Sequence, residues 1–262
     1  MKSLVRKAPH LLKDWDGIAK KIRRYGRITV FLDFDGTLVA IAPRPDQVRL
    51  MPATRKILQR LAKDPHATLV VVSGRRRAEL LEYIGIPGIH YFGLYGWEGS
   101  AKSSLSKSAR ATLRRASSAL KPLLKAYPSL WVEDKRSSLS VHLLDVPAAV
   151  QPRIRRELSA ILKPFRATLH AVGNIRDVEI LPRSIRGKGK AVSRFLAQPA
   201  HRKSFPLYFG DDFSDESGFA AVRRGASVHV GTRRPTRAQY RLRNPVDVTA
   251  ALAKLEAHLS ES

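Results

Sequence analysis

The sequence contains no cysteine and is short of acidic residues. Its 262 residues include 48 Lys and Arg but only 22 Asp and Glu, which gives a formal net charge of +26. Without cysteine, disulfides, thiolate nucleophiles and cysteine-bound zinc are all excluded. The lack of disulfides is compatible with a reducing compartment, and we expect a cytoplasmic protein.

Long apolar runs are also absent. No stretch reaches the roughly 20 apolar residues that a membrane span needs, and the N-terminus lacks the uninterrupted apolar region of a secretory signal. We therefore expect no membrane partner. The hydrophobic content of 44% supports a proper core, and the length fits one large domain or a core domain with a modest insertion.

The basic excess raises the question of a polyanionic partner such as nucleic acid. The Lys and Arg residues are spread over the chain, and no zinc-finger or RNP-type aromatic pattern accompanies them. We expect a solvated basic surface, with only weak, non-specific binding to nucleic acid. A basic polyanion-binding protein remains the alternative from a different functional class, and the oligomeric state is left open.

Two closely spaced aspartates follow an apolar run. Residues Ile28–Leu32 predict a strand buried on both faces, as in a parallel sheet, and Asp33 and Asp35 come directly after it. Residues i and i+2 of an extended chain point the same way, so both carboxylates should face one spot. Gly36 then turns the chain and places the small hydroxyl of Thr37 beside them. Because adjacent like charges need a cation or a shared proton, this motif predicts a metal site able to handle phosphate.

The residues Asp-Phe-Asp-Gly over 33–36 could also be the start of an EF-hand calcium loop. Such a loop needs a bidentate Glu at its twelfth position, where this chain has Arg44. The residues before Asp33 also read as a strand rather than a helix. The calcium-loop interpretation is therefore the weaker one.

A second strand, expected over 68–72, ends in Ser73-Gly74-Arg75. Its small hydroxyl and glycine turn repeat the arrangement of the first motif. Ser73 could bind a phosphate oxygen or cap the helix predicted over 76–83, and the sequence leaves both roles open. A third strand is expected over 89–94, and an amphipathic helix is expected to precede the first strand, from Leu11 to Tyr25.

The pattern changes near residue 103. Two helices and four short strands predict a small α+β module with its own sheet, inserted between core segments 1–102 and 183–262. The helices are expected over 103–126 and 148–162, and the strands over 130–134, 139–144, 167–172 and 177–181.

After residue 183 the α/β alternation resumes, and charged groups again mark the ends of elements. Lys188 or Lys190, at the start of a helix expected over 191–196, is a candidate phosphate partner, because a lysine there opposes the helix dipole. A strand over 207–210 ends in four acids within six residues, Asp211, Asp212, Asp215 and Glu216. Such hard oxygen ligands suit Mg²⁺. A last strand over 226–230 and a helix over 246–259 complete a doubly wound, Rossmann-like parallel α/β core.

In this order the motifs resemble those of haloacid dehalogenase (HAD) superfamily phosphatases, and more narrowly of trehalose-6-phosphate phosphatases. The resemblance covers nearly all of 27–258 and implies a HAD-like core with an inserted α+β cap. Its most specific part is Gly-Asp-Asp-x-Ser-Asp-Glu over 210–216. The other matching segments are Asp33 to Leu38, Ser73 to Arg75, Val178 to Pro182 and Lys188-Gly189.

The resemblance implies a Mg²⁺-dependent phosphatase of trehalose 6-phosphate. Asp33 would attack the phosphoryl group, Asp35 would transfer protons, and Ser73 and Lys188 would hold the phosphoryl oxygens. Mg²⁺ would be bound by Asp33, the Asp35 carbonyl and Asp211, with Asp212 and Asp215 supporting or joining that shell. The substrate-binding candidates are Thr37, Gly74, Arg75, Glu98, Lys135, His142 and Glu179.

The residues that depart from the family pattern are at positions expected to bind the sugar of the substrate. The usual Gly-His-Gly or Gly-Asn-Gly before Glu98 is Gly93-Leu94-Tyr95-Gly96 here. In the cap, Leu143 and Leu144 follow His142 where the family has an aromatic residue and Arg. A phosphatase of another phosphorylated sugar or of a glycosyl-glycerate is therefore the alternative substrate assignment.

Overall fold

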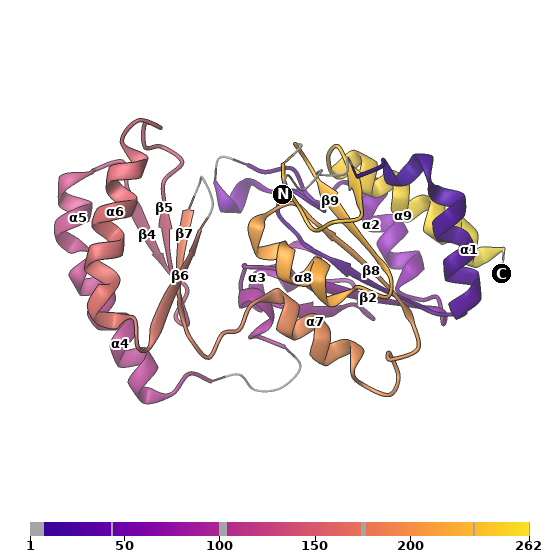
Figure 1. Ribbon diagram of the computed structural model, residues 1–262, viewed down its shortest axis with the longest axis horizontal. Coiled ribbons are helices and arrows are strands. Elements are labelled where there is room, and N and C mark those ends of the chain that lie inside the picture. The colour runs from indigo at the N-terminus through magenta and orange to yellow at the C-terminus, as the bar shows by residue number, and fades with distance from the viewer. Residues whose placement is uncertain (1–7, 43, 100–103, 174–176, 233, 262) are drawn as a thin grey trace, which may run out of the picture. The chain divides into compact units, whose positions relative to one another are not determined.

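The computed structural model describes residues 8–42, 44–99, 104–173, 177–232 and 234–261. The chain divides into two compact units (Figure 1). Unit 1 comprises Met1–Ala101 and Arg186–Ser262, and unit 2 comprises Lys102–Ile185. The first predicted core–insertion boundary, between residues 102 and 103, lies outside the described residues. Each unit has a sheet of its own.

Unit 1 is built on a six-stranded sheet in the order β10-β9-β8-β1-β2-β3, in which every neighbouring pair is parallel. The order runs outward from β1 in both directions, so the topological switch point lies between β1 and β8, where ligands of such sheets bind. This confirms the predicted fold class. The strands are β1 (Ile28–Leu32), β2 (Ala67–Val72), β3 (His90–Phe92), β8 (Phe205–Gly210), β9 (Ala226–Val230) and β10 (Tyr240–Leu242).

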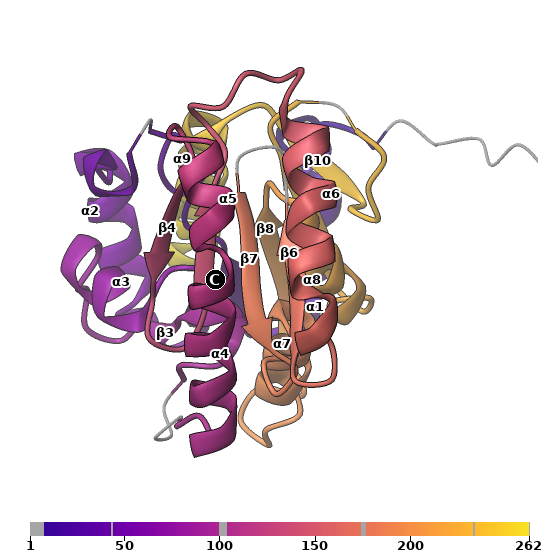
Figure 2. The ribbon, with the colours of Figure 1, turned by 90° about the vertical axis from the view of Figure 1, so that its left-hand side faces the viewer.

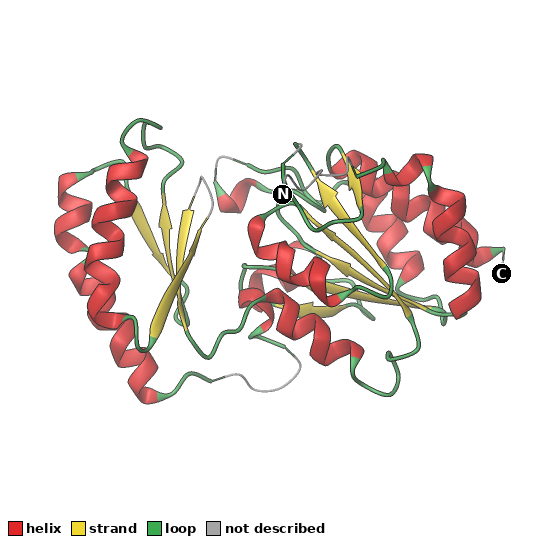
Figure 3. Ribbon diagram, in the orientation of Figure 1, coloured by secondary structure: helices red, strands yellow, loops and turns green. Residues whose placement is uncertain are grey.

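Helices cover both faces of this sheet (Figures 1 and 3). Apolar side chains of α1, α2, α3 and α9 share one core cluster, and those of α7 and α8 share another on the opposite face. Among the described residues, no helix combines the length and apolar composition needed to cross a membrane. The helices are α1 (Trp15–Tyr25), α2 (Pro52–Leu61), α3 (Arg77–Tyr83), α7 (Lys188–Leu196), α8 (Glu216–Ala221) and α9 (Pro245–Ser260).

Unit 2 is a four-stranded antiparallel sheet in the order β4-β5-β7-β6. Its three helices lie on one face of the sheet (Figures 1 and 2). Leu113 and Ala116 of α4 and Ile154 and Leu158 of α6 are buried in this unit. The elements are α4 (Lys107–Ala119), α5 (Lys121–Ala126), β4 (Trp131–Asp134), β5 (Leu139–His142), α6 (Gln151–Leu162), β6 (Leu169–Gly173) and β7 (Asp177–Pro182).

Several predicted elements differ from the structure in their limits. The helix predicted over 103–126 is two helices that meet at Leu120, because Pro122 cannot donate a backbone hydrogen bond to an earlier turn. The helix predicted from Leu11 is a 3₁₀ turn, Leu11–Lys13, followed by α1, and Asp14 between them has a non-helical backbone.

Near the C-terminal end of the chain, two predictions are wrong. The strand over 226–230 is not the last, because β10 follows it. The helix predicted from residue 191 already begins at Lys188, since Gly187, with φ of +79°, turns the chain immediately before it. A three-residue strand such as β10 offers too few residues for an alternation pattern to stand out.

Gly225, just before β9, packs directly against the backbone of β8, and a mutation at this position tests the fold. A Cβ added at Gly225 would lie 1.7 Å from the backbone oxygen of Pro206, so Gly225→Ala must displace backbone. We expect a loss of about 1–3 kcal/mol in the free energy of unfolding, the usual cost of overpacking. Urea denaturation measures it.

Gly17→Ala in α1 is the matched control. Its Cβ would come nearest to the carboxylate of Asp14, at 3.3 Å, which is a contact with a side chain and not with backbone. Alanine is also favoured over glycine in a helix by roughly 0.5–1 kcal/mol, so this variant should be as stable as the wild type or more so. Equal stabilities of the two variants would contradict the packing described for Gly225.

Candidate active site

The carboxyl ends of β1 and β8 bring acidic residues together at the switch point of the sheet. Asp33 follows β1 directly, and its backbone N–H donates to the backbone oxygen of Phe209 in β8 at 3.0 Å. Asp211 follows β8. Its carboxylate lies against Gly36, where a Cβ would come within 2.1 Å of Oδ2, and Gly36 also has φ of +77°. Only glycine fits this turn without displacing Asp211.

A buried lysine links the two halves of unit 1. The ammonium nitrogen of Lys188, the first residue of α7, lies 2.8 Å from Asp33 Oδ1 and 2.8 Å from Asp215 Oδ1. All three side chains are almost completely removed from solvent. Lys190, the other sequence candidate, is exposed. Buried charges of this kind persist only when they are paired, so the three groups hold one another in place.

The electrostatics show an excess of negative charge. Burial, together with the charge of Asp215, raises the pKa of Asp33 well above its usual range despite the opposing effect of Lys188. Burial and Asp215 likewise raise the pKa of Asp211 to about 7. Burial alone would lower the pKa of Lys188, but Asp215 and Asp33 outweigh it and raise that pKa. One lysine therefore does not compensate the surrounding carboxylates.

Oxygen atoms of Asp33, Asp211 and Asp215 lie within 4.8 Å of one another. This set of hard ligands fits Mg²⁺. Asp215, however, already accepts hydrogen bonds from Lys188, from the hydroxyl of Tyr208 at 2.8 Å and from the backbone N–H of Asp212 at 3.0 Å. Asp33 and Asp211 are therefore better placed to bind a cation, and Asp215 acts by holding Lys188.

The Tyr208 hydroxyl was missed by sequence reasoning. Its side chain is fully buried in β8, and burial followed by the charge of Asp215 raises its pKa. A buried tyrosine almost always requires a hydrogen-bond partner. The sequence does contain a signal for this role: a tyrosine in an otherwise apolar strand, three residues before an acidic cluster.

The Asp35 carboxylate is paired with an arginine from the second strand-end motif. The strand ends at Leu32, Phe34 is buried, and the Asp35 carboxylate accepts two hydrogen bonds from Arg75, at 2.7 and 2.8 Å. The Arg75 guanidinium lies over the rings of Phe34 and Tyr83, with its carbon 5.3 and 5.1 Å from the ring centroids. Arg75, expected to bind substrate, is thus a buried partner of Asp35.

Ser73, Gly74 and Thr37 lie in the loops around these acids. The Ser73 hydroxyl accepts a hydrogen bond from the backbone N–H of Arg75 at 3.1 Å, and the residue that caps α3 is Arg76. The alternative role of Ser73 as a helix cap is therefore wrong. The buried Thr37 hydroxyl has no hydrogen-bond partner among the described residues. Such a group is available to a ligand oxygen.

The segment that departs from the family pattern supports the Ser73 loop. The backbone N–H groups of Tyr95 and Leu94 donate to the backbone oxygens of Ser73 and Arg75, each at 2.8 Å. Leu94 and Tyr95 both have positive φ, 44° and 58°, a costly conformation for these residues. The Glu98 carboxylate accepts from the backbone N–H of Arg77 at 2.6 Å, so it stabilises the start of α3.

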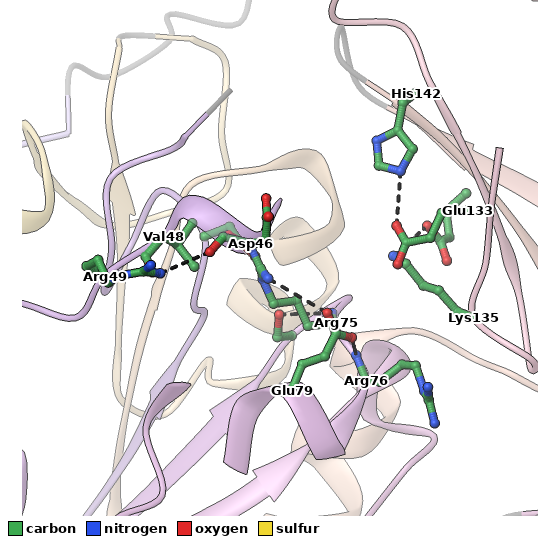
Figure 4. A network of polar contacts seen from close by, with 12 residues as sticks. Asp46, Val48, Arg49, Arg75, Arg76, Glu79, Glu133, Lys135 and His142 are labelled. Carbon is green, nitrogen blue, oxygen red and sulfur yellow. Dashed lines mark hydrogen bonds and ion pairs between the residues drawn. The ribbon is translucent and has the colours of Figure 1, made fainter. Parts of the chain in front are cut away.

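Unit 2 contains a second polar cluster. Glu179 of β7 is buried and accepts hydrogen bonds from Lys135 at 3.3 Å and from the Ser138 hydroxyl at 2.6 Å. A hydrogen bond of 3.0 Å joins Nε2 of His142 to the carboxylate of Glu133 (Figure 4). Burial would lower the pKa of Lys135, but Glu179 and Glu133 outweigh it and raise that pKa.

The sequence candidates therefore fall into groups. The Asp212 carboxylate accepts a hydrogen bond from the backbone N–H of Phe213, at the start of the turn Phe213–Asp215. The Glu98 carboxylate accepts one from the first residue of α3. The other candidates are divided between the two units. Unit 1 holds Asp33, Asp35, Thr37, Ser73, Gly74, Arg75, Lys188, Asp211 and Asp215, and unit 2 holds Lys135, His142 and Glu179.

The chain is similar to known proteins over most of its length. The trehalose-phosphatase family model matches residues 31–246. The trehalose-phosphate phosphatase of Mycobacterium leprae is 31% identical over 89% of this chain, which spans 58% of that relative's length.

Solved structures show the same fold. The C-terminal domain of Candida albicans trehalose-6-phosphate phosphatase is 20% identical with a TM-score of 0.83, over 95% of this chain and 98% of that one. A Bacteroides thetaiotaomicron protein described among the HAD superfamily phosphatases is 14% identical with a TM-score of 0.58. The match covers 89% of this chain and 96% of that protein's chain. A family match over more than half of the residues, on this fold, shows that the chain belongs to the trehalose-phosphatase family.

Proposed function

We propose that the chain hydrolyses trehalose 6-phosphate to trehalose and phosphate, as a phosphoric monoester hydrolase. The observation that carries the proposal is the buried Lys188, fixed between Asp33 and Asp215 beside the carboxylate of Asp211. A phosphoryl group needs positive charge for its oxygens and a carboxylate positioned for attack. These residues supply both at the switch point of the sheet.

In the first step Asp33 attacks phosphorus, the bond between phosphorus and the sugar oxygen breaks, and an aspartyl-phosphate forms. Lys188 holds a phosphoryl oxygen and keeps Asp33 oriented, and Tyr208 fixes Lys188 through Asp215. In the second step water attacks phosphorus, and the bond to the Asp33 oxygen breaks. The hydroxyls of Ser73 and Thr37 donate hydrogen bonds to phosphoryl oxygens.

Asp35 transfers the protons. Its carboxyl group gives a proton to the departing sugar oxygen, and the resulting carboxylate takes a proton from the attacking water. Arg75 pairs with both oxygens of this carboxylate and is itself fixed against Phe34 and Tyr83. The guanidinium therefore orients Asp35 and stabilises the charge that proton donation creates.

The donor set of unit 1 fits Mg²⁺ because its ligand atoms are hard oxygens. Burial, together with neighbouring carboxylates, also raises the pKa values of Asp33 and Asp211, so a cation would favour their charged forms. Asp33, Asp211 and the backbone carbonyl of Asp35 would hold the ion. Bound there, Mg²⁺ would act as a Lewis acid and offset the charge of nucleophile and phosphate.

Unit 2 serves as the cap that recognises the sugar. Lys135, Glu179 and His142 form hydrogen-bonding groups whose orientation is fixed by Ser138 and Glu133. Fixed, desolvated groups discriminate strongly between hydroxyl patterns, because a wrong pattern leaves them without a partner.

The substrate is tested with a panel of phosphorylated sugars. We expect kcat/KM for trehalose 6-phosphate to exceed the values for sucrose 6-phosphate, glucose 6-phosphate and a glucosylglycerate phosphate, measured as phosphate release. If another member leads the panel, the sugar assignment is wrong and the phosphatase assignment stands. If no member is hydrolysed, the proposed function is wrong.

The nucleophile is tested by Asp33→Asn. The amide keeps the size of the side chain but cannot attack phosphorus, so kcat should fall by roughly 10⁴-fold or more. Because Lys188 keeps Asp215 as an ion partner but loses Asp33, the melting temperature should fall, and circular dichroism should show that the variant remains folded. Asp16→Asn, at an exposed position in α1, is the control and should keep full activity. A folded Asp33→Asn protein with near wild-type turnover would refute the assignment.

The cation site predicts how stability depends on pH. The pKa of Asp211 is about 7 in the folded chain, above its ordinary value of 3.8. Between these values the folded state binds more protons than the unfolded state, so this group makes the metal-free protein less stable as pH rises. Mg²⁺ binding requires the deprotonated form and should therefore raise the melting temperature more at about pH 8 than at about pH 5.

Asp211→Asn is the matched control for that experiment. The variant cannot lose a proton at residue 211, so both the pH-dependent loss of stability and the Mg²⁺ response should be reduced. A Mg²⁺ response that is equal at the two pH values, or unchanged in the variant, would count against a cation at Asp211.

A further inference from the structure

The sheet of unit 2 has two chemically different faces. Val132, Val141, Val178 and Ile180 alternate with polar residues along β4, β5 and β7, and three of these four are buried. The register places Trp131 opposite His142, and His142 opposite Asp177, in one row. The next row contains Glu133, Ser140 and Glu179. The polar rows share one face of the sheet, because residues two apart along a strand point the same way.

Trp131 is the unexpected member of this face. Its side chain is 42% exposed, although tryptophan is among the most favourable residues to bury. Its ring is stacked on His142, with centroids 3.6 Å apart and planes at 11°. His142 is in turn hydrogen-bonded to Glu133 at 3.0 Å. The indole is therefore held flat at the edge of a charged cluster, with part of its surface open to solvent.

The position of the ring relative to the charged groups suits a sugar. Trp131 and Glu179 lie on strands two apart in the sheet and in adjacent rows, so they are separated by about 10 Å across the sheet at a strand spacing of about 4.8 Å. Such a span is comparable to two linked pyranose rings. A pyranose has an apolar face of C–H groups and a rim of hydroxyls, so it matches an aromatic ring beside Lys135 and Glu179.

We propose that Trp131 is a specificity-determining residue, whose ring stacks against a pyranose ring of the substrate while the Lys135–Glu179 pair binds its hydroxyls. The proposal rests on the proposed phosphatase function. It also accounts for the leucines after His142: Leu143 is buried and Leu144 offers no polar group, so an aromatic contact comes from β4 instead.

The test compares Trp131→Ala, Trp131→Phe and Trp131→Leu on two substrates. For trehalose 6-phosphate, or the sugar phosphate that the wild type hydrolyses best, Trp131→Ala should raise KM about tenfold and change kcat less than threefold, since stacking is a binding interaction. Trp131→Phe should raise KM less than Trp131→Leu, because it keeps a ring. Acetyl phosphate, which has no ring, should be hydrolysed equally by all four proteins.

Two further measurements separate binding from folding. Tyr25→Ala removes an aromatic side chain of similar exposure, 40%, from unit 1 and should leave both substrates unaffected. In an Asp33→Asn background, titration with trehalose 6-phosphate should change the tryptophan fluorescence, and Trp131→Phe should reduce that change, because only Trp15 and Trp97 remain. A fluorescence change in Trp131→Phe as large as that of the background would overturn the inference.

The kinetic outcomes are also decisive. Equal KM values for wild type and Trp131→Ala, or equal losses on the sugar phosphate and on acetyl phosphate, would overturn the inference and leave the proposed function intact. A wild-type protein that hydrolyses acetyl phosphate but no sugar phosphate would overturn the proposed function, and the inference with it.

Discussion

The ammonium group of Lys188 lies in the interior of unit 1 between the carboxylates of Asp33 and Asp215. A charge buried at this depth is tolerated only with partners in good geometry, and removing one partner of a buried pair usually costs about 3–5 kcal/mol. The contact joins the end of β1, the start of α7 and the turn after β8, which belong to the two sequence segments of unit 1. The same ion pairs that hold these segments together therefore also fix the carboxylate that we propose as the nucleophile.

The charge balance of the site contrasts with that of the chain. The protein carries a formal +26, yet its acids are concentrated at the carboxyl ends of β1 and β8, where burial and mutual repulsion raise the pKa values of Asp33 and Asp211. A binder of polyanions would gain nothing from such a cluster. A phosphoryl-transfer site that recruits a divalent cation requires one, and the basic surface can attract a phosphorylated substrate toward it.

The two faces of the sheet in unit 2 carry different kinds of side chain. One face buries aliphatic residues, and the other carries Trp131, Glu133, His142 and Glu179 in adjacent rows. Because a strand alternates its side chains, four short strands are enough to supply both a core and a polar surface. Residues on the polar face can therefore differ without disturbing the core.

The sequence by itself determined the α/β class, the strand Ile28–Leu32 and the candidate acids, because apolar periodicity and strand-end motifs are local properties. Only the tertiary structure decided which partner each group has. Asp35 pairs with Arg75, and Lys188 rather than Lys190 is buried. Tyr208 donates a hydrogen bond to Asp215, and Trp131 stacks on His142. These contacts join residues far apart in the chain or across a strand register, and neither the register nor the path of a loop follows from local pattern.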